Sequence, residues 1–440
     1  MRPLILTAYA LFSLGLAGVA SATLWWMLHA WRTPEVLRQT GFTVASRPPA
    51  MSFSLIVPGR HEEAVMGTTL RQLMESDHPD FEVIAVVGHD DPGTREVAEG
   101  AARQYPGRMK VVMDHNWPKN KPKALNSALP HCRGQVVGVF DAEDEVDPRL
   151  LRQVDATFQS ENAHVVQGGV QLMNFRSSWY SLRNCLEYFF WFRSRLHLHA
   201  EHGFIPLGGN TVFVRTDVLR AVGGWDPECL AEDCELGVRL STLGARVAIA
   251  YSADLVTREE TPDSLRGLFK QRTRWNQGFL QVLRKRAWRE LPSRRQKMLA
   301  RFTLSMPFMQ AFAGVGIVVS VVTGVLLRAP VALAMLSFVP AVPTLSTLAF
   351  EIAGLREFCR LYYVRPRLSD YVWLVVGTFP YQLVLAGAAV RAVVREALGL
   401  RGWEKTAHIG AHRQPQVVDL RDELDVFVPE TTGAGGGDRR

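Results

Sequence analysis

A short acidic segment follows the apolar residues 136–140 and carries five acids in seven residues: Asp141, Glu143, Asp144, Glu145 and Asp147. Their charges repel one another unless a cation or solvent relieves them. Carboxylates two residues apart at a strand end can turn toward one hard cation. Mg²⁺ or Mn²⁺ held in this way keeps coordination positions open for substrate phosphates. The alternative is a solvated acidic turn that opens a helix, with Asp147 as its N-cap, and the pattern by itself supports both interpretations.

A second pair of acids, Glu232 and Asp233, follows the Gly-Gly-Trp-Asp sequence at residues 223–226. Carboxylates at a junction between a loop and a helix can cap the helix and interact favourably with its dipole. A carboxylate that faces the hydroxyl of a bound acceptor can instead take its proton as a general base. These residues alone leave both roles open.

A third cluster reads Gln-Arg-Thr-Arg-Trp at residues 271–275. In a helix, its functional side chains share one face, at i, i+3, i+4 and i+7: Gln271, Arg274, Trp275 and Gly278. The forked donors of a guanidinium suit phosphate, and an indole suits the apolar face of a sugar ring. The alternative is an interfacial helix with Trp275 at the depth of lipid headgroups, and the two roles are compatible.

These clusters lie within a pattern of alternating short strands and helices. Strands are predicted at residues 52–57, 82–87, 110–113 and 135–140, and helices at residues 64–76, 94–104 and 123–130. Such alternation predicts a mostly parallel sheet with helices on both faces, in which ligands sit beyond the carboxyl ends of the strands. Polar clusters follow three of these strands, at residues 58–63, 89–91 and 141–147.

Six motifs resemble, in order, those of family 2 glycosyltransferases, in particular the membrane-anchored synthases related to cellulose, hyaluronan, chitin and poly-N-acetylglucosamine synthases. They are the opening loop at residues 57–63, the acids Asp90 and Asp91, the basic loop at 120–126, Asp141-Ala142-Glu143 in place of a DxD, Glu232-Asp233 in place of an ED, and the QxxRW at 271–275. The resemblance covers residues 52–283. It implies a GT-A-type α/β domain, nucleotide-binding and built on a mostly parallel sheet, inserted between transmembrane helices.

The resemblance also implies a role for each matching residue. Donor binding is expected from Pro58, Glu62, Asp90, Asp91, Lys121, Gln271 and Arg274. Mg²⁺ or Mn²⁺ is expected on Asp141 and Glu143, with Asp144 as a competing ligand, and the base is expected to be Asp233, with Glu232 beside it. Acceptor binding is expected from Trp275, Gly209 and Asn210. The chain departs from the usual motifs at Arg60-His61, at Glu143 and at Ala231, which precedes the ED pair.

Four apolar runs without a charged residue flank this polar part, at residues 3–28, 303–327, 329–350 and 371–390. Each reaches the ~20 residues that span a bilayer, which argues against a wholly soluble enzyme. Arg32, Arg38 and Arg47 follow the first run and only Arg2 precedes it, so the positive-inside rule predicts a cytoplasmic catalytic domain in a multi-pass protein of the cell membrane. The number of crossings stays open, because the last run contains Pro380 and is followed by basic residues.

The predicted organisation has four parts. A transmembrane helix occupies residues 1–31, the catalytic domain with interfacial helices at its end occupies 32–290, further transmembrane helices occupy 291–400, and a partly flexible tail occupies 401–440. The tail contains the sequence Gly-Trp-Glu-Lys-Thr-Ala-His at residues 402–408, similar to a short C-terminal motif of related transferases, for which a membrane-surface anchor is the favoured interpretation. Five cysteines without a paired spacing fit reduced thiols in the cytosol.

The resulting hypothesis is an inverting transfer of sugar from a nucleotide-diphosphate sugar, specifically a UDP-sugar, to a saccharide acceptor by a processive polysaccharide synthase. A non-processive transferase acting on a lipid or lipid-linked acceptor would keep every motif and is the main alternative. A catalytically silent membrane scaffold would not need Asp233, Arg274 and Trp275 together. Membrane lipids are expected partners. Nucleic acid is not, because the net charge of +7 forms no basic stripe interleaved with aromatic residues.

Overall fold

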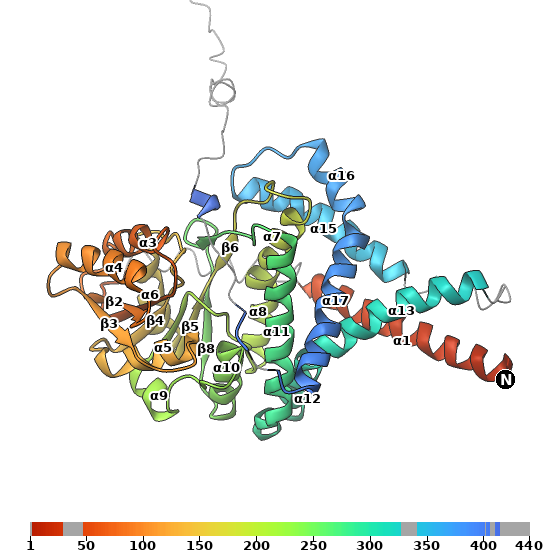
Figure 1. Cartoon of the computed structure of the whole chain (residues 1–440), viewed down its shortest axis with the longest axis horizontal. Coiled ribbons are helices and arrows are strands. Elements are labelled where there is room, and N and C mark those ends of the chain that lie inside the picture. Colours follow the sequence, from red (N-terminus) through yellow and green to blue (C-terminus); the bar gives the residue numbers. More distant parts are fainter. Residues whose placement is uncertain (1, 30–46, 327–340, 401, 405–409, 414–440) are drawn as a thin grey trace, which may run out of the picture.

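The computed structural model of the 440-residue chain describes residues 2–29, 47–326, 341–400, 402–404 and 410–413. A half built on β-sheet carries five of the six predicted motifs, and a helical half lies beside it (Figure 1). The seven strands and helices predicted between residues 52 and 140 all form, each within two residues of its predicted bounds. The predicted flexibility of the tail concerns residues that lie almost entirely outside the described part.

The main sheet has seven strands in the order β3-β2-β1-β4-β7-β5-β8. Their bounds are β1 Phe53–Gly59, β2 Phe81–Gly88, β3 Met109–Asp114, β4 Val136–Val139, β5 Val165–Gly168, β7 Val212–Arg215 and β8 Val247–Ala250. All neighbours pair in parallel except β7, which is antiparallel to both β4 and β5. A small second sheet pairs β6 (Val170–Leu172) with β9 (Thr257–Glu259). The prediction of a mostly parallel sheet is therefore confirmed.

The side chains of β1 show why helices cover both faces of the sheet. Phe53, Leu55 and Val57 point to one face, because alternate residues of a strand share a face. There they pack with α3 (Met66–Met74), α4 (Pro92–Gln104) and α6 (Leu150–Glu161). Ile56 points to the other face, which is covered by α5 (Lys121–Ala128), α8 (Leu196–Glu201), α9 (Thr216–Ala221) and α10 (Glu232–Thr242). The carboxyl ends of the strands are left for the loops that carry the polar clusters.

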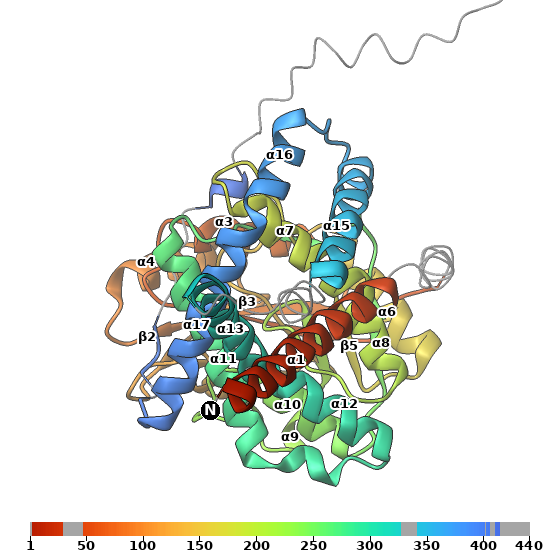
Figure 2. The same ribbon diagram turned by 90° about the vertical axis from the view of Figure 1, so that its right-hand side faces the viewer.

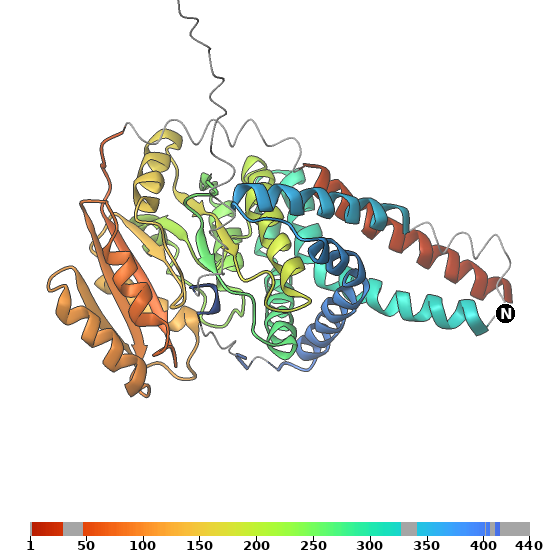
Figure 3. The ribbon, with the colours of Figure 1, turned by 90° about the horizontal axis from the view of Figure 1, so that it is seen from above.

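The helical half joins the two ends of the chain. It contains α1 (Arg2–His29), α7 (Ser181–Phe190), η4 (Trp191–Arg195), α11 (Leu265–Lys285), η5 (Ala287–Glu290), α12 (Arg294–Leu304), α13 (Met306–Leu326), α15 (Ala341–Leu361), α16 (Leu368–Val376) and α17 (Thr378–Ala397). Helix α11 packs along α17, and α1 contacts both α13 and α15. Figures 1 and 3 show α1 and α13 extending away from the sheet, and Figure 2 looks onto the molecule from their side. The helix of the QxxRW motif is thus part of the helical half.

One described helix segment, Thr7–Trp25, is long and apolar enough to cross a membrane. Helices α16 and α17 meet that standard only together, as a pair bent by 48°. The bend lies at Gly377, three residues before Pro380. Pro380 sits in the first turn of α17, where its missing N–H costs no helical hydrogen bond. Of the predicted run at residues 329–350, the part before residue 341 lies outside the described chain.

The large apolar side chains exposed to solvent gather on the helical half. Between residues 48 and 305 only Trp117, Leu243, Leu265 and Met298 belong to this group. The others lie on α1, α13, α15, α16 and α17 and around their ends, among them Trp25, Phe308, Phe312, Trp373 and Phe379. Contiguous exposed apolar surface of this kind marks a region that contacts a membrane or another apolar partner.

A buried arginine holds four helices of the helical half together. Arg183 of α7 donates to both carboxylate oxygens of Glu351 on α15, at 2.8 and 2.7 Å. It also donates to the carbonyl oxygen of Leu374 at 2.7 Å and to the hydroxyl of Thr378 at 2.6 Å. Its side chain is 5% exposed, so every partner lies in a region from which water is largely excluded. One residue thereby holds α7, α15, α16 and α17 together.

Replacing Arg183 with Met should lower the free energy of unfolding by roughly 3 kcal/mol or more, because it leaves Glu351 buried without its partner. The measurement is the thermal unfolding midpoint of the purified protein in detergent. Arg246→Met is the matched control, since Arg246 and its partner Glu161 are both largely exposed and such pairs contribute ~0–1 kcal/mol. Equal shifts in the two variants would show that the Arg183 network does not stabilise the packing of these helices.

Candidate active site

The acidic loop follows β4 and is organised around a buried carboxylate. Asp144 is fully buried and accepts from the backbone N–H of Asp141 at 2.8 Å. The amide of Asn210 donates to both Asp144 oxygens, at 3.0 and 3.1 Å, and also to Glu259. Burial, together with the charges of Glu259 and Asp141, raises the pKa of Asp144 well above its usual value. Both oxygens of Asp144, the predicted competing metal ligand, are therefore engaged by protein groups, and its role as a ligand stays a prediction.

The last acid of the loop caps the turn that leads into a helix. Helix α6 begins at Leu150, and the residue before it, Arg149, makes no side-chain capping bond. The side chain of Asp147 accepts from the backbone N–H of Arg149 at 2.9 Å, and its carbonyl oxygen accepts from the N–H of Leu150 at 3.0 Å. The helix thus begins two residues later than the sequence predicts, but the predicted capping contact of Asp147 is present.

Lys121 brings three predicted site residues together. It stands at the start of α5, whose N-cap Asn120 accepts from the N–H of Lys123 at 3.0 Å. Its ammonium pairs with Asp141 and donates to the carbonyl oxygen of Gly209 at 2.7 Å. Burial opposes the charge, but the carboxylates of Asp141 and Glu232 outweigh it and raise the pKa of Lys121, so the ammonium stays charged. A fixed cation therefore lies beside the acidic loop.

The ED pair occupies the first turn of α10, next to this cation. A β-carbon added at Gly209 would lie 3.3 Å from an oxygen of Asp233 and 3.7 Å from the nitrogen of Lys121, so the absence of a side chain there opens the space between them. Burial and the charge of Asp233 raise the pKa of Glu232 to about 7. Burial also raises the pKa of Asp233. A carboxylate with a raised pKa is suited to act as a general base near neutral pH.

The QxxRW helix approaches the ED pair through a glycine. Gly278 of α11 lies directly against Ala231, the residue before Glu232, and leaves no room for a β-carbon. This contact accounts for a small residue at position 231. It also brings Arg274 close enough to act electrostatically on Glu232 and Asp233, whose pKa values it lowers against the effect of burial.

Trp275 and Gln271 lie on the inner side of α11. The guanidinium of Arg272 lies 4.7 Å from the centre of the Trp275 ring, and the ring of Tyr188 lies 6.2 Å from it. Arg272 in turn pairs with Glu187 of α7. Gln271 is buried, and its side-chain oxygen has no hydrogen-bond partner among the described residues. The indole is therefore held in a fixed orientation, as a stacking platform requires.

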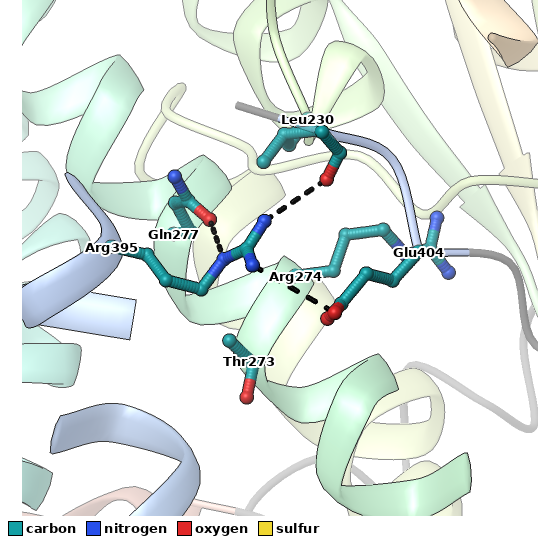
Figure 4. A pocket seen from close by; sticks show the side chains of 7 residues that line it. Leu230, Thr273, Arg274, Gln277, Arg395 and Glu404 are labelled. Carbon is teal, nitrogen blue, oxygen red and sulfur yellow. Dashed lines mark hydrogen bonds and ion pairs between the residues drawn. The ribbon is translucent and has the colours of Figure 1, made fainter. Parts of the chain in front are cut away.

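The chain end reaches the same helix. The guanidinium of Arg274 lies 4.5 Å from the centre of the Trp403 ring. Figure 4 shows the small pocket that Arg274 and Glu404 line, with Arg395 reaching toward Gln277 and Glu404. Glu404 also pairs with Arg391 at 2.7 Å. The predicted role of Gly402-Trp403-Glu404 as a membrane-surface anchor is untested, but in this structure the motif packs against the QxxRW helix.

The two acids predicted to meet the nucleotide base differ in their surroundings. Asp91 is 2% exposed, caps α4 through the N–H of Thr94 and accepts from the N–H of His61 at 2.6 Å. Asp90 is about a third exposed and pairs with Arg60 at 3.0 Å. Asp90 is thus the more accessible of the two. Nearby, Pro58 lies in β1 and Glu62 is buried.

The structure therefore brings Lys121, Asp141, Gly209 and Asp233 into one group, with Glu232 and Arg274 within electrostatic reach. Asn210 is committed to Asp144 and Glu259, so its acceptor role stays a prediction. Sequence reasoning missed Tyr188 beside Trp275 and Glu259 beside Asn210. Neither residue belongs to one of the six motifs, and only the folded structure shows that each lies beside a predicted site residue.

The oxygen donors at this site fit a divalent cation that binds partly through substrate. No group of three or more His, Cys, Asp or Glu side chains in the described ranges forms a ready metal cage. Mg²⁺ usually binds through one or two carboxylates and completes its shell with water and substrate phosphates. Asp141 and Glu143, both in the acidic loop, can supply such a pair, and their metal-binding role remains a prediction.

Comparisons with known proteins agree with this geometry. The model of a glycosyltransferase-like family 2 matches residues 48–278. Beta-monoglucosyldiacylglycerol synthase of Synechocystis sp. is 30% identical over 243 residues, which cover 54% of this chain and 50% of that protein. Glucomannan 4-beta-mannosyltransferase 7 of Arabidopsis thaliana is 24% identical over 242 residues, 52% of this chain and 43% of that protein. The chain thus spans about half the length of the curated relatives it matches.

A solved structure extends the similarity to the whole fold. The mannosyltransferase of Pyrobaculum calidifontis, in complex with GDP-Man and Mn²⁺, superposes with a TM-score of 0.58 and 17% identity. The match covers 89% of this chain and 99% of that one. Because the family model matches more than half of the residues, and because the Lys121, Asp141 and Asp233 group lies at the carboxyl ends of a mostly parallel sheet, the chain belongs to the family 2 glycosyltransferases.

Proposed function

We propose that the protein transfers one sugar from a nucleotide-diphosphate sugar, with inversion, to a lipid or lipid-linked acceptor at the cytoplasmic face of the cell membrane. The observation that carries the proposal is the position of the Asp233 carboxylate, next to Gly209 and Lys121 at the start of α10. The same helix turn meets α11, which packs along α17 in the apolar helical half.

The residues divide the chemistry between them. Lys121 and Arg274 provide fixed positive charge for the diphosphate, and such preorganised charge stabilises a leaving group as it develops. A divalent metal held by Asp141 and Glu143 would add Lewis-acid stabilisation of the same phosphates. Asp233 takes the proton of the acceptor hydroxyl, so that the oxygen attacks the anomeric carbon as the bond to the phosphate breaks. Trp275, held by Arg272 and Tyr188, stacks on a sugar ring.

Two observations favour a lipid acceptor over a growing polysaccharide. The exposed large apolar side chains are concentrated on the helices that contact α11 or lie beside them, so the helix that carries Trp275 adjoins the apolar part of the protein. The relative at 30% identity carries the name of a glucosyldiacylglycerol synthase. Processive polysaccharide synthesis is the second candidate, because a glucomannan mannosyltransferase is also similar and the QxxRW motif is complete.

Product mass separates the two candidates. Purified protein in nanodiscs that contain diacylglycerol, supplied with UDP- or GDP-sugars and Mn²⁺ or Mg²⁺, should yield lipid bearing a single added sugar by mass spectrometry. Release of nucleoside diphosphate in the same reactions identifies the donor. A ladder of products that grows with time would instead support the processive candidate. The absence of metal-dependent donor turnover with any acceptor would contradict both.

Asp233→Asn should lower kcat by about 10²- to 10⁴-fold, the usual contribution of a general base, and leave donor binding unchanged. Donor affinity is measured by calorimetry and turnover by nucleotide release. Glu235→Gln is the matched control, since Glu235 lies two residues further along α10 and pairs with Arg239. Full activity in Asp233→Asn would show that another group takes the proton.

The pH profile should have an acidic limb set by the Glu232 and Asp233 pair. A base works only when deprotonated, and because the pKa of Glu232 is raised to about 7, kcat/KM should fall as the pH drops below that value. Glu232→Gln removes one negative charge beside Asp233. The pKa of Asp233 should then decrease, and the acidic limb should move to lower pH. A limb at the same pH in both proteins would mean that the pair does not control turnover.

A further inference from the structure

Arg413, near the end of the described residues, contacts the backbone of the acidic loop. Arg413 belongs to η6 (Ala411–Arg413), and its guanidinium donates to the carbonyl oxygens of Glu143 at 2.8 Å and Asp144 at 3.1 Å. It also donates to the carbonyl oxygen of Val65 at 3.0 Å. Arg413 and Glu143 are separated by 270 positions in the sequence. Arg413 thus holds the backbone of the loop that carries the predicted metal ligands.

A threonine of α3 completes this support. The hydroxyl of Thr69 lies 2.6 Å from the carbonyl oxygen of Ala142 and 3.1 Å from that of Asp144, and it accepts from Arg413 at 2.5 Å. Three successive carbonyl oxygens, from residues 142 to 144, therefore face Arg413 and Thr69. Because the carbonyl groups of residues 142–144 all point toward these two side chains, the backbone orientation of Glu143 is fixed.

The segment before Arg413 has its own anchor. The carboxylate of Glu260 accepts from the backbone N–H of Gly410 at 3.2 Å and of Ala411 at 2.5 Å. Glu260 is 5% exposed, and it follows Glu259, which receives the amide of Asn210. Gly410 has a φ of +70°, which a glycine adopts without strain. Residues 410–413 are therefore docked by specific bonds to the segment that also supports Asp144.

The partners of Arg413 distinguish a geometric role from a purely electrostatic one. Each of its four hydrogen bonds goes to a neutral oxygen, three carbonyls and one hydroxyl, and not to a carboxylate of the loop. A residue that only supplied a compensating positive charge would not need several directed hydrogen bonds to neutral oxygens. A planar guanidinium offers several donors in fixed directions, whereas a lysine ammonium is a point charge on a flexible stem.

We propose that Arg413 is a positioning residue for metal binding: it holds the backbone of residues 142–144 so that Asp141 and Glu143 face the diphosphate of the donor together. The inference rests on the proposed function, because it takes these two carboxylates as the metal ligands. Groups that orient metal ligands without touching the metal typically change metal affinity by about 10- to 100-fold when they are removed.

The test is a titration of the full-length protein in detergent with Mn²⁺, in which electron paramagnetic resonance measures the bound metal. UDP or GDP is present, according to the donor that the enzyme consumes. Arg413→Gln and Arg413→Lys should each raise the apparent Kd for Mn²⁺ by about tenfold or more. The affinity for the nucleotide without metal should not change. Arg246→Gln, which alters a remote exposed ion pair, should match the wild type in both measurements.

An unchanged Mn²⁺ affinity in Arg413→Gln would overturn the proposal, whatever happens to the unfolding temperature. If that variant does not fold, Arg413→Lys decides. Wild-type Mn²⁺ affinity in the lysine variant would show that charge alone is required, and would overturn the forked role. Failure of the wild type itself to bind Mn²⁺ with nucleotide would contradict the proposed function, and this inference with it, so the two failures are distinguishable.

Discussion

The structure depends on how one short loop accommodates five carboxylates. Four of the acids have a partner in the protein: Asp141 with Lys121, Asp144 with Asn210, Glu145 with Arg258, and, within the same segment, Asp147 with Arg149. The repulsion that made the segment conspicuous is therefore relieved mainly by fixed protein groups rather than by solvent. Three of these counterparts come from α5, from the loop before β7 and from β9, so the loop acquires its shape only when the whole domain has assembled.

Helix α11 extends this dependence to the helical half. Arg272 pairs with Glu187 of α7, and Arg274 of the same turn lies against the ring of Trp403. One turn further along α11, Gly278 contacts Ala231, the residue before the ED pair. The same helix packs along α17. Helix α11 therefore connects the ED pair directly to the helices that carry the exposed apolar side chains.

The sequence predicted what depends on local pattern. The strands and helices up to residue 140 follow from the alternation of apolar runs, and the polar clusters mark the strand ends. The antiparallel insertion of β7 depends on pairing between distant segments, which periodicity does not encode. Asp91 before Pro92 carried the local signature of an N-cap, and the structure shows this role. Arg413 could not be recognised, because its partners are backbone carbonyls that have no sequence signature.

Lys121 links the two chemical halves of the proposed site. Its ammonium pairs with Asp141 of the acidic loop, and its charge also lowers the pKa values of Glu232 and Asp233 against the effect of burial. Burial alone would drive these two acids to the protonated state, in which neither can accept a proton. Lys121 and Arg274 offset that tendency for both acids. In the proposed function, the same cation would support the loop that faces the diphosphate and keep the base able to accept a proton, so a substitution of Lys121 would affect both roles together.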